Sequence, residues 1–156
     1  MSKVTRATQA LDKAGVAYAV FTYDYDPGAD RIGVQAAESL GIDPGTVLKT
    51  LMAEVDGRPV CVLMRSDREV NMKKLAAAFR GKSARMMAPA AAERATGYHV
   101  GGISPFGQKR AHPAAVDEAA LAADAVFVNG GQRGLQLRLA PHDLVKALSA
   151  FAASLS

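Results

Sequence analysis

The chain has 156 residues, of which 49% are hydrophobic and 22% charged, and it carries a formal net charge of +4. This composition excludes a disordered chain, and the length predicts one domain over residues 1–156 with a single core. With no run of about 18–20 apolar residues, no apolar N-terminal core and only one cysteine, Cys61, we expect a cytoplasmic protein that has no intrachain disulfide and no contact with the membrane.

Helical and extended patterns alternate along the chain. Helices are predicted where apolar residues recur every three or four positions, and they stop at glycines such as Gly15 or begin at capping residues such as Asn71. Strands are predicted where β-branched and aromatic residues run without that spacing. In chain order we expect helix 4–14, strand 16–25, helix 34–41, a turn at 43–45, two strands within 46–67, helix 72–79, strand 83–87, helix 89–96, an extended segment 111–116, strands within 124–131 and 134–140, and a last helix from Pro141 with Leu144, Val145, Leu148 and Phe151 on one face.

Two strand pairs indicate the fold class. Asp56 and Gly57 separate two β-type runs, which is the strongest short-range hairpin signal in the chain, and glycines 130, 131 and 134 separate a second pair. Helices and strands are intermixed, and the pattern is not a regular βαβ repeat. We therefore predict an α+β fold, with a mixed, partly antiparallel β-sheet or barrel-like core and surrounding helices.

Lys49 lies inside a predicted strand, in "TVLKTLM". Alternate residues of a strand share a face, and here both faces are mostly apolar, so the strand is expected to be covered on both sides. A lysine in such a strand needs a partner, reaches solvent along a packed stem, or lines a pocket. The functional hypothesis is an unpaired cation that faces a polar or anionic ligand; the alternative is a lysine whose head reaches solvent.

Residues 97–109, "GYHVGGISPFGQK", form a segment that we call the glycine loop. Passive connections usually have about 4–6 residues, so this segment is long. Its glycines allow a ligand to approach the main chain and allow N–H groups to converge on one oxygen, while Pro105 stiffens the backbone. Such donors beside a lysine suit an ester carbonyl or a phosphate, although simple turn chemistry is an alternative. The spacing matches neither a P-loop nor a dinucleotide fingerprint.

Four stretches together resemble the YbaK-type aminoacyl-tRNA deacylases, which are related to the editing domain of bacterial prolyl-tRNA synthetases. The stretches are "TYDYDP", "VLKTLM", "TGYHVGGISPFGQK" and "VNGGQRGLQLRLAPHDL", in the family's order over nearly the whole chain. The resemblance implies a free-standing, trans-editing deacylase that acts on Cys-tRNA(Pro) or Cys-tRNA(Cys). In that family the thiol of the substrate is thought to attack its own ester, which requires no protein nucleophile, metal or other cofactor.

The resemblance also implies the residues of the site. Lys49 and Gly101 take the catalytic positions by this analogy, since Lys49 positions the aminoacyl-adenosine end and the main chain of 101–105 contacts the substrate near its ester. Aminoacylated tRNA is the implied partner, and prolyl-tRNA synthetase is a further partner in a ternary complex; the oligomeric state stays open. The implied substrate-binding residues are Tyr23, Ile32, Thr50, Gly102, Ile103, Ser104, Pro105, Asn129 and Gln136.

Two departures from the family pattern leave the accepted amino acid open. Close relatives often have serine before the glycine pair and an acidic residue after "RGL", where this chain has Asn129 and Gln136. The alternatives are a deacylase for another small amino acid, alanine or serine, and a non-catalytic RNA- or nucleotide-binding module of the same fold. The three histidines are scattered, and Cys61 lacks a second cysteine, so no metal site is predicted. The candidates for contacts with the tRNA body are Lys73, Lys74, Arg80, Lys82, Arg85, Lys109, Arg110 and Arg133.

Overall fold

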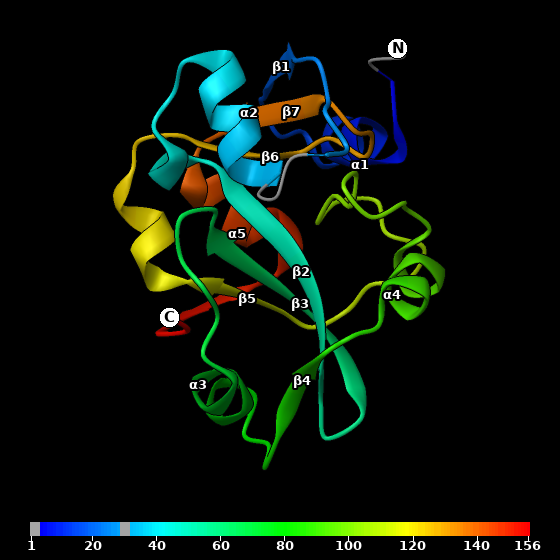
Figure 1. Cartoon of the computed structure of the whole chain (residues 1–156), viewed down its shortest axis with the longest axis vertical. Coiled ribbons are helices and arrows are strands. Elements are labelled where there is room, and N and C mark those ends of the chain that lie inside the picture. Colours follow the sequence, from blue (N-terminus) through cyan, green and yellow to red (C-terminus); the bar gives the residue numbers. More distant parts are fainter. Residues whose placement is uncertain (1–3, 29–31) are drawn as a thin grey trace.

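The computed structural model describes residues 4–28 and 32–156. Helices and strands alternate as the sequence pattern predicts (Figure 1). No helix in these two ranges is long and apolar enough to cross a membrane. The elements are α1 Arg6–Ala14, β1 Ala19–Thr22, α2 Ile32–Leu40, η1 Pro44–Thr46, β2 Leu48–Val55, β3 Arg58–Arg65, α3 Met72–Ala78, β4 Ala84–Met86, α4 Pro89–Thr96, β5 Ala114–Asp117, η2 Glu118–Ala122, β6 Val126–Asn129, β7 Leu135–Leu139, α5 Pro141–Leu148 and β8 Phe151–Ala153.

The strands form two sheets. The smaller has the order β1-β7-β6 and is antiparallel throughout. The larger has the order β4-β2-β3-β5-β8, with antiparallel pairs around β2 and parallel pairs on either side of β5. An isolated parallel bridge between Val47 and Phe127 connects the start of β2 to β6. The predicted α+β class is confirmed, but the two described sheets do not close into a barrel.

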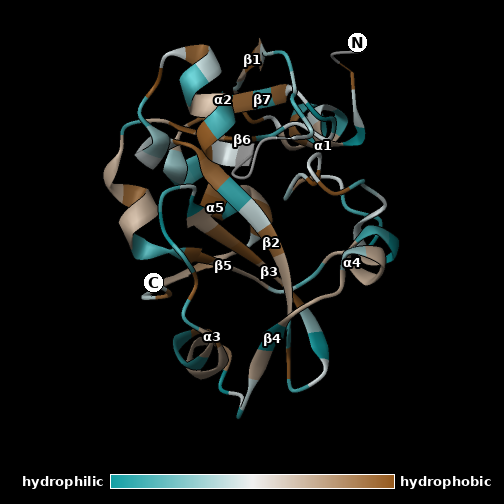
Figure 2. Cartoon of the chain, viewed as in Figure 1, coloured by the Kyte–Doolittle hydropathy of each residue, from teal (hydrophilic) through white to brown (hydrophobic). Residues whose placement is uncertain are grey.

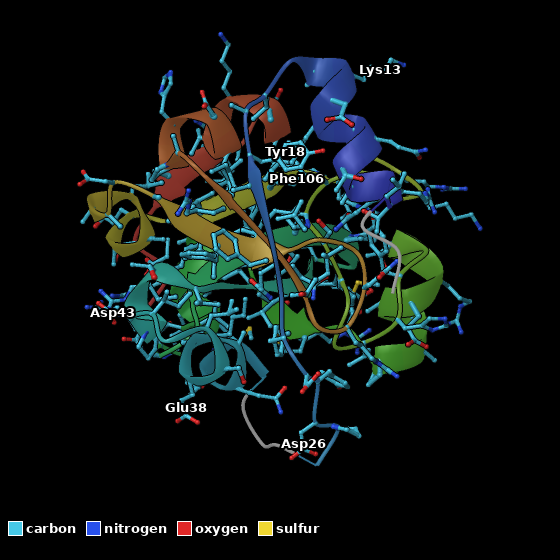
Figure 3. The ribbon with its side chains drawn as sticks, turned by 90° about the horizontal axis from the view of Figure 1, so that it is seen from above. Lys13, Tyr18, Asp26, Glu38, Asp43 and Phe106 are labelled. Carbon is cyan, nitrogen blue, oxygen red and sulfur yellow. The ribbon has the colours of Figure 1, made fainter. Side chains whose placement is uncertain are left out.

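The core is continuous with the glycine loop. Its largest cluster contains Leu63 from β3, Leu137 from β7 and Phe106 from the loop, all buried. Phe106 points into the interior below α1, where the partly buried Tyr18 packs against the same cluster (Figure 3). Apolar residues concentrate on the central strands, and polar residues lie on the outer faces of the helices (Figure 2). Burial of Phe106 therefore anchors the loop to the sheet.

The C-terminus differs from the prediction. The last helix ends at Leu148, because Ser149 takes a left-handed backbone conformation with φ 50° and its amide caps the helix on the Lys146 carbonyl. Phe151 is therefore not on the helix face, as expected, but begins β8, which pairs with β5. Its ring makes an edge contact with Phe79, with centroids 5.1 Å apart. The pairing of β8 with β5 thus accompanies the end of α5 at Leu148, although the apolar spacing of the sequence would allow the helix to continue to Phe151.

Two further boundaries differ from the sequence prediction. The predicted strand 16–25 shortens to β1, and the predicted extended segment 111–116 becomes β5, which begins three residues later and ends one residue later. The sequence pattern did not predict η2, which directly follows β5. For β1 and β5, pairing with other strands, rather than local propensity, sets the ends of the element.

Substitution of Leu63 tests this core. Leu63 is 0% exposed on a strand with neighbours on both sides. We expect Leu63→Ala to lower the free energy of unfolding by about 2–5 kcal/mol, because it leaves a cavity, whereas Leu63→Met should lower it by less than about 1.5 kcal/mol. Urea denaturation measures both values. Equal losses in the two variants would contradict this placement of Leu63.

Candidate active site

A cavity of about 390 Å³ lies between β2, α4 and the glycine loop. Consecutive residues from Val47 to Met52 form its floor. Helix α4 closes one side with Pro89 and Ala92, which are three residues apart and so share a face. The other lining residues come from seven separate places in the chain: Gly33, Ser66, Glu69, Met86, Met87, Val100, Gly101, Ile103, Asn129 and Gln136.

Lys49 reaches this cavity from β2. Its side chain is 22% exposed, and Nζ lies 3.3 Å from Oε1 of Glu69, whose own side chain is 83% exposed. The expectation of an unpaired cation is therefore wrong, since the ammonium group has a carboxylate partner. Because that partner is in solvent, the pair contributes at most about 1 kcal/mol. A polar or anionic group of a ligand can thus replace Glu69 beside the ammonium at small cost.

Side chains from three elements hold the glycine loop at Val100 and Gly101. The carboxylate of Glu93 accepts a 2.8 Å hydrogen bond from the Val100 amide, and Arg133 donates a 3.0 Å bond to the Val100 carbonyl. Asn129 donates a 3.2 Å bond to the Gly101 carbonyl. The bond from the Val100 amide, followed by the nearby His99, lowers the pKa of Glu93. These contacts fix the direction of three successive peptide groups, from His99–Val100 to Gly101–Gly102, at the cavity wall.

The loop also carries amides that have no protein acceptor. The Gly102 amide donates to the His99 carbonyl at 2.8 Å. Among the described residues, the amides of Gly101, Ile103 and Ser104 have no acceptor, and two of these three residues line the cavity. The Val100 carbonyl bonds to Arg133, so the Gly101 N–H of the same trans peptide points the opposite way. Gly101 and Ile103, whose amides have no acceptor among the described residues, thus line the same cavity as Lys49, and their use as donors to a ligand stays a prediction.

The two central glycines are explained by packing within the protein. Gly101 has φ +91°, and a Cβ there would lie 2.7 Å from the Tyr25 hydroxyl. A Cβ on Gly102 would lie 2.9 Å from the backbone nitrogen of Arg133. The guanidinium of Arg133 also lies 5.6 Å from the centroid of the Tyr25 ring. The sequence pattern indicates no role for Tyr25 or Glu93 and predicts only a tRNA contact for Arg133, because it does not show which residues far apart in the chain meet.

The structure brings together only some of the predicted site residues. Ile32 begins α2, but its side chain lies outside the described part of the structure. Tyr23, Gly102, Ser104 and Pro105 are buried and do not line the cavity. Their roles, like those of the lining residues, stay predictions. The predicted residues that line the cavity are Lys49, Thr50, Gly101, Ile103, Asn129 and Gln136.

Three buried polar atoms, the Tyr23 hydroxyl near Gln136, Oγ1 of Thr50 and Oε1 of Gln136, have no hydrogen-bond partner among the described residues. Thr50 and Gln136 line the cavity itself. Burial raises the pKa of the Tyr23 hydroxyl, with a smaller opposing effect of the neighbouring Gln136, yet the two groups do not form a hydrogen bond of good geometry. Since a buried orphan polar group costs about 1–3 kcal/mol, these atoms indicate a place for a polar ligand or for water.

The thiol and the histidines lie away from the cavity lining. Burial raises the pKa of Cys61 to about 12, and its Sγ lies 3.8 Å from the amide nitrogen of Gln108. Cys61 is therefore a neutral, packed side chain near pH 7. Within residues 4–28 and 32–156, no group of three or more His, Cys, Asp and Glu side chains is arranged to hold a metal ion, and the prediction about metals stays a prediction.

Comparison with known proteins identifies the family. A family model described as the aminoacyl-tRNA editing domain matches residues 26–147 of this chain. The chain belongs to this family, which confirms the predicted resemblance and the predicted class of enzyme, an aminoacyl-tRNA deacylase.

Individual relatives agree with this assignment. The chain is 34% identical over 143 residues to EbsC of Enterococcus faecalis, provisionally named a Cys-tRNA(Pro)/Cys-tRNA(Cys) deacylase, and the match covers 90% of this chain and 86% of EbsC. It is 35% identical over 95 residues to a proline–tRNA ligase of Acidithiobacillus ferrooxidans, covering 61% of this chain but only 16% of the ligase. A crystal structure provisionally described as a trans-editing enzyme for prolyl-tRNA synthetase has a TM-score of 0.84 at 23% identity, covering 100% of this chain and 98% of the other, which shows the fold.

Gly107 tests how the glycine loop is seated. It has φ +66°, and a Cβ there would collide with the Arg6 carbonyl and lie 2.9 Å from the Ala7 nitrogen, at the start of α1. Gly57 has a similar φ of +82° with no atom within 4 Å of an added Cβ. Both alanine variants carry left-handed strain of roughly 1–2 kcal/mol. We expect Gly107→Ala to be less stable than Gly57→Ala by a further ~1–3 kcal/mol, because backbone atoms must move.

Thermal or urea unfolding of the two variants gives this difference directly. If Gly107→Ala and Gly57→Ala lose the same stability, the loop is not packed on α1 as described.

Proposed function

We propose that the cavity receives the aminoacylated adenosine of mischarged tRNA and that the protein removes cysteine from tRNA specific for proline. The observation that carries this proposal is that Lys49 and Gly101 line one cavity of about 390 Å³. That volume falls within the range of about 300–1,000 Å³ that is usual for small-ligand sites. The relationship to EbsC supports cysteine as the amino acid.

The reaction in this proposal uses the thiol of the substrate. The thiol sulfur attacks the carbonyl carbon of its own ester, a carbon–sulfur bond forms and the ester carbon–oxygen bond breaks. The thiol proton passes to the departing ribose oxygen, which leaves as the free hydroxyl of tRNA, and water then opens the cyclic thiolactone. The role of the protein is to hold the thiol within reach of the carbonyl, which converts the step into an oriented intramolecular reaction.

Two groups of the cavity suit the charge that develops during this step. As the thiol attacks, the carbonyl oxygen becomes negative, and the amides of Gly101 and Ile103 have no competing protein acceptor. Lys49 adds a positive charge on the opposite side, from β2. A donor fixed in place before the reaction typically contributes about 10²- to 10³-fold in rate.

Two polar atoms that line the cavity are suited to bind the α-amino group of the substrate. Oε1 of Gln136 is buried, lacks a donor and lies at the cavity wall, and Oγ1 of Thr50 shares these properties. An α-ammonium group has three donors and would satisfy both. The apolar wall of Met52, Met87 and Ile103 then faces a small side chain. A cysteine side chain fits beside this apolar wall and supplies the thiol for the reaction. An alanine or serine side chain fits there by its size but supplies no thiol.

The partner follows from the same comparisons. Because part of the chain is similar to a segment of a proline–tRNA ligase, we infer that the protein acts in trans on tRNA that prolyl-tRNA synthetase has charged. A ternary complex with that synthetase is part of this proposal. Residues 1–156 would act as one unit.

An assay on charged tRNA tests the proposed substrate. We expect rapid loss of the ester from tRNA(Pro) charged with cysteine, and a rate at least about tenfold lower with alanine or serine, because neither supplies a thiol. Acid-gel separation of charged and free tRNA measures the rates. Cys61→Ala should behave like the original protein.

Each other outcome of this assay has a meaning. Faster release of alanine or serine would replace the cysteine proposal with another deacylase specificity. Binding of tRNA without any release would indicate a non-catalytic module.

Removal of the Lys49 charge tests the site itself. We expect both Lys49→Ala and Lys49→Met to lower kcat/KM by about 10²-fold or more, because the methionine keeps the apolar stem and loses only the ammonium. The free energy of unfolding should change by less than about 1 kcal/mol, since the Glu69 partner is exposed. Lys146→Met, at an exposed position on α5, is the matched control. Collapse of the circular dichroism spectrum in Lys49→Ala would instead assign Lys49 a structural role.

A further inference from the structure

Helix α4 separates the cavity from a second, shallower site. Pro89 and Ala92 line the cavity, whereas Ala91, Arg94 and Ala95 line a groove of about 320 Å³. Residues spaced by three and four positions share one face of a helix, so the two sets lie on different faces. A helix with its side chains is about 10–12 Å across, which places the groove roughly one helix width from the cavity.

Four basic side chains line this groove, which we call the basic groove: Arg94, Lys109, Arg110 and His112. The first three are exposed, and no carboxylate is among the lining residues. Within the described ranges, none of these three makes an ion pair. Burial lowers the pKa of His112, and the charge of Arg110 lowers it further, as expected beside a cation that has no counterion. The groove is thus positive and uncompensated.

Other predicted tRNA contacts are already engaged within the protein. Lys74 donates a 2.7 Å hydrogen bond to the Ser156 carbonyl, Arg85 pairs with Glu54 at 3.1 Å, and Arg133 holds the Val100 carbonyl. The remaining candidates, at 73, 80 and 82, lie in or just after α3. In Figure 1, α3 and α4 lie on opposite sides of β2 and β4.

We propose that the basic groove binds phosphates of the RNA strand that leads to the aminoacylated end, so that this strand crosses α4 between groove and cavity. The proposal rests on the proposed function, since it takes the cavity to hold the terminal adenosine. One helix width corresponds to about three stacked nucleotides at the ~3.4 Å axial rise of a strand. The guanidinium group of arginine can bind two oxygens of one phosphate at once, and the lysine ammonium group adds a point charge. Both suit an RNA backbone, whose phosphates are regularly spaced.

The position of the groove is set by the same loop that builds the cavity. The Lys109 amide donates to the Thr96 carbonyl at 2.8 Å, which closes the glycine loop onto the end of α4. Gln108 bonds both the Ser104 carbonyl, at 3.0 Å, and His112, at 2.9 Å. The groove and the cavity therefore share one rigid wall, so an RNA strand bound in one has a defined position in the other.

Binding of uncharged tRNA to the full chain tests the basic groove. We compare the triple variant Arg94→Gln, Lys109→Gln, Arg110→Gln with a matched triple variant at 73, 80 and 82, also changed to glutamine, by fluorescence anisotropy between 50 and 200 mM salt. The groove triple should weaken binding at least about tenfold and lower the slope of log K against log salt by about 2, which is three contacts at about 0.7 each. The matched triple should stay within about twofold of the original protein.

A small ester separates this proposal from the proposed function. Cysteinyl-adenosine lacks the upstream phosphates, so the groove triple should hydrolyse it at the original kcat/KM, while its KM for charged tRNA rises about tenfold. Equal tRNA binding by the two triple variants, or binding that does not depend on salt, would contradict RNA binding by the basic groove. Neither result would affect the proposed deacylase activity, which the hydrolysis assay tests separately. Loss of tRNA binding in the groove triple, without any ester hydrolysis by the original protein, would support the groove and refute the deacylase. If the groove triple lost binding to prolyl-tRNA synthetase but kept its binding to tRNA, the proposal that the basic groove binds RNA would be wrong.

Discussion

The site depends on one close contact, between the glycine loop and the turn that joins β6 to β7. At Gly102 the two backbones approach so closely that a single methyl group would not fit. The contact is then fixed on each side by hydrogen bonds, from Asn129 to the Gly101 carbonyl and from Arg133 to the Val100 carbonyl. Of the two peptides held in this way, the Val100–Gly101 peptide keeps its N–H, on Gly101, without an acceptor among the described residues, whereas the N–H of the next peptide, on Gly102, donates to the His99 carbonyl.

Strand β2 of the larger sheet supplies the other half of the site, and it begins directly after the bridge that connects the two sheets. It pairs with β3 and β4 in the larger sheet, and Val47 at its start bridges to Phe127 of the smaller one. Consecutive residues from Val47, just before the strand, to Met52 line the cavity. Lys49 lies two residues beyond the bridge, where its side chain lines the cavity and pairs with the exposed carboxylate of Glu69.

The sequence predicts the elements of this fold well and the contacts between them poorly. Period-2 and period-3.6 patterns locate the β2–β3 hairpin and the helices, since these depend on local spacing. The end of α5 at Leu148 could not be predicted, because it depends on pairing with β5, far away in the chain. Likewise, the glycines of 101 and 102 suggest freedom of the backbone, but the sequence does not say that Tyr25 and the 132–133 backbone occupy the space beside them. The lysine partner, Glu69, is missed for the same reason.

Asn129 and Gln136 show how two similar side chains take different parts in one site. They are direct partners across the β6–β7 pair, and both line the cavity. Asn129 is saturated, since its amide nitrogen donates to Gly101 and Gln132 and its oxygen accepts from the Gly131 amide at 2.7 Å. Within the described part of the chain, Oε1 of Gln136 is buried without a donor. The Asn129 amide therefore holds the wall of the cavity, whereas Gln136 keeps an acceptor open there, at a cost of about 1–3 kcal/mol that a polar partner would remove.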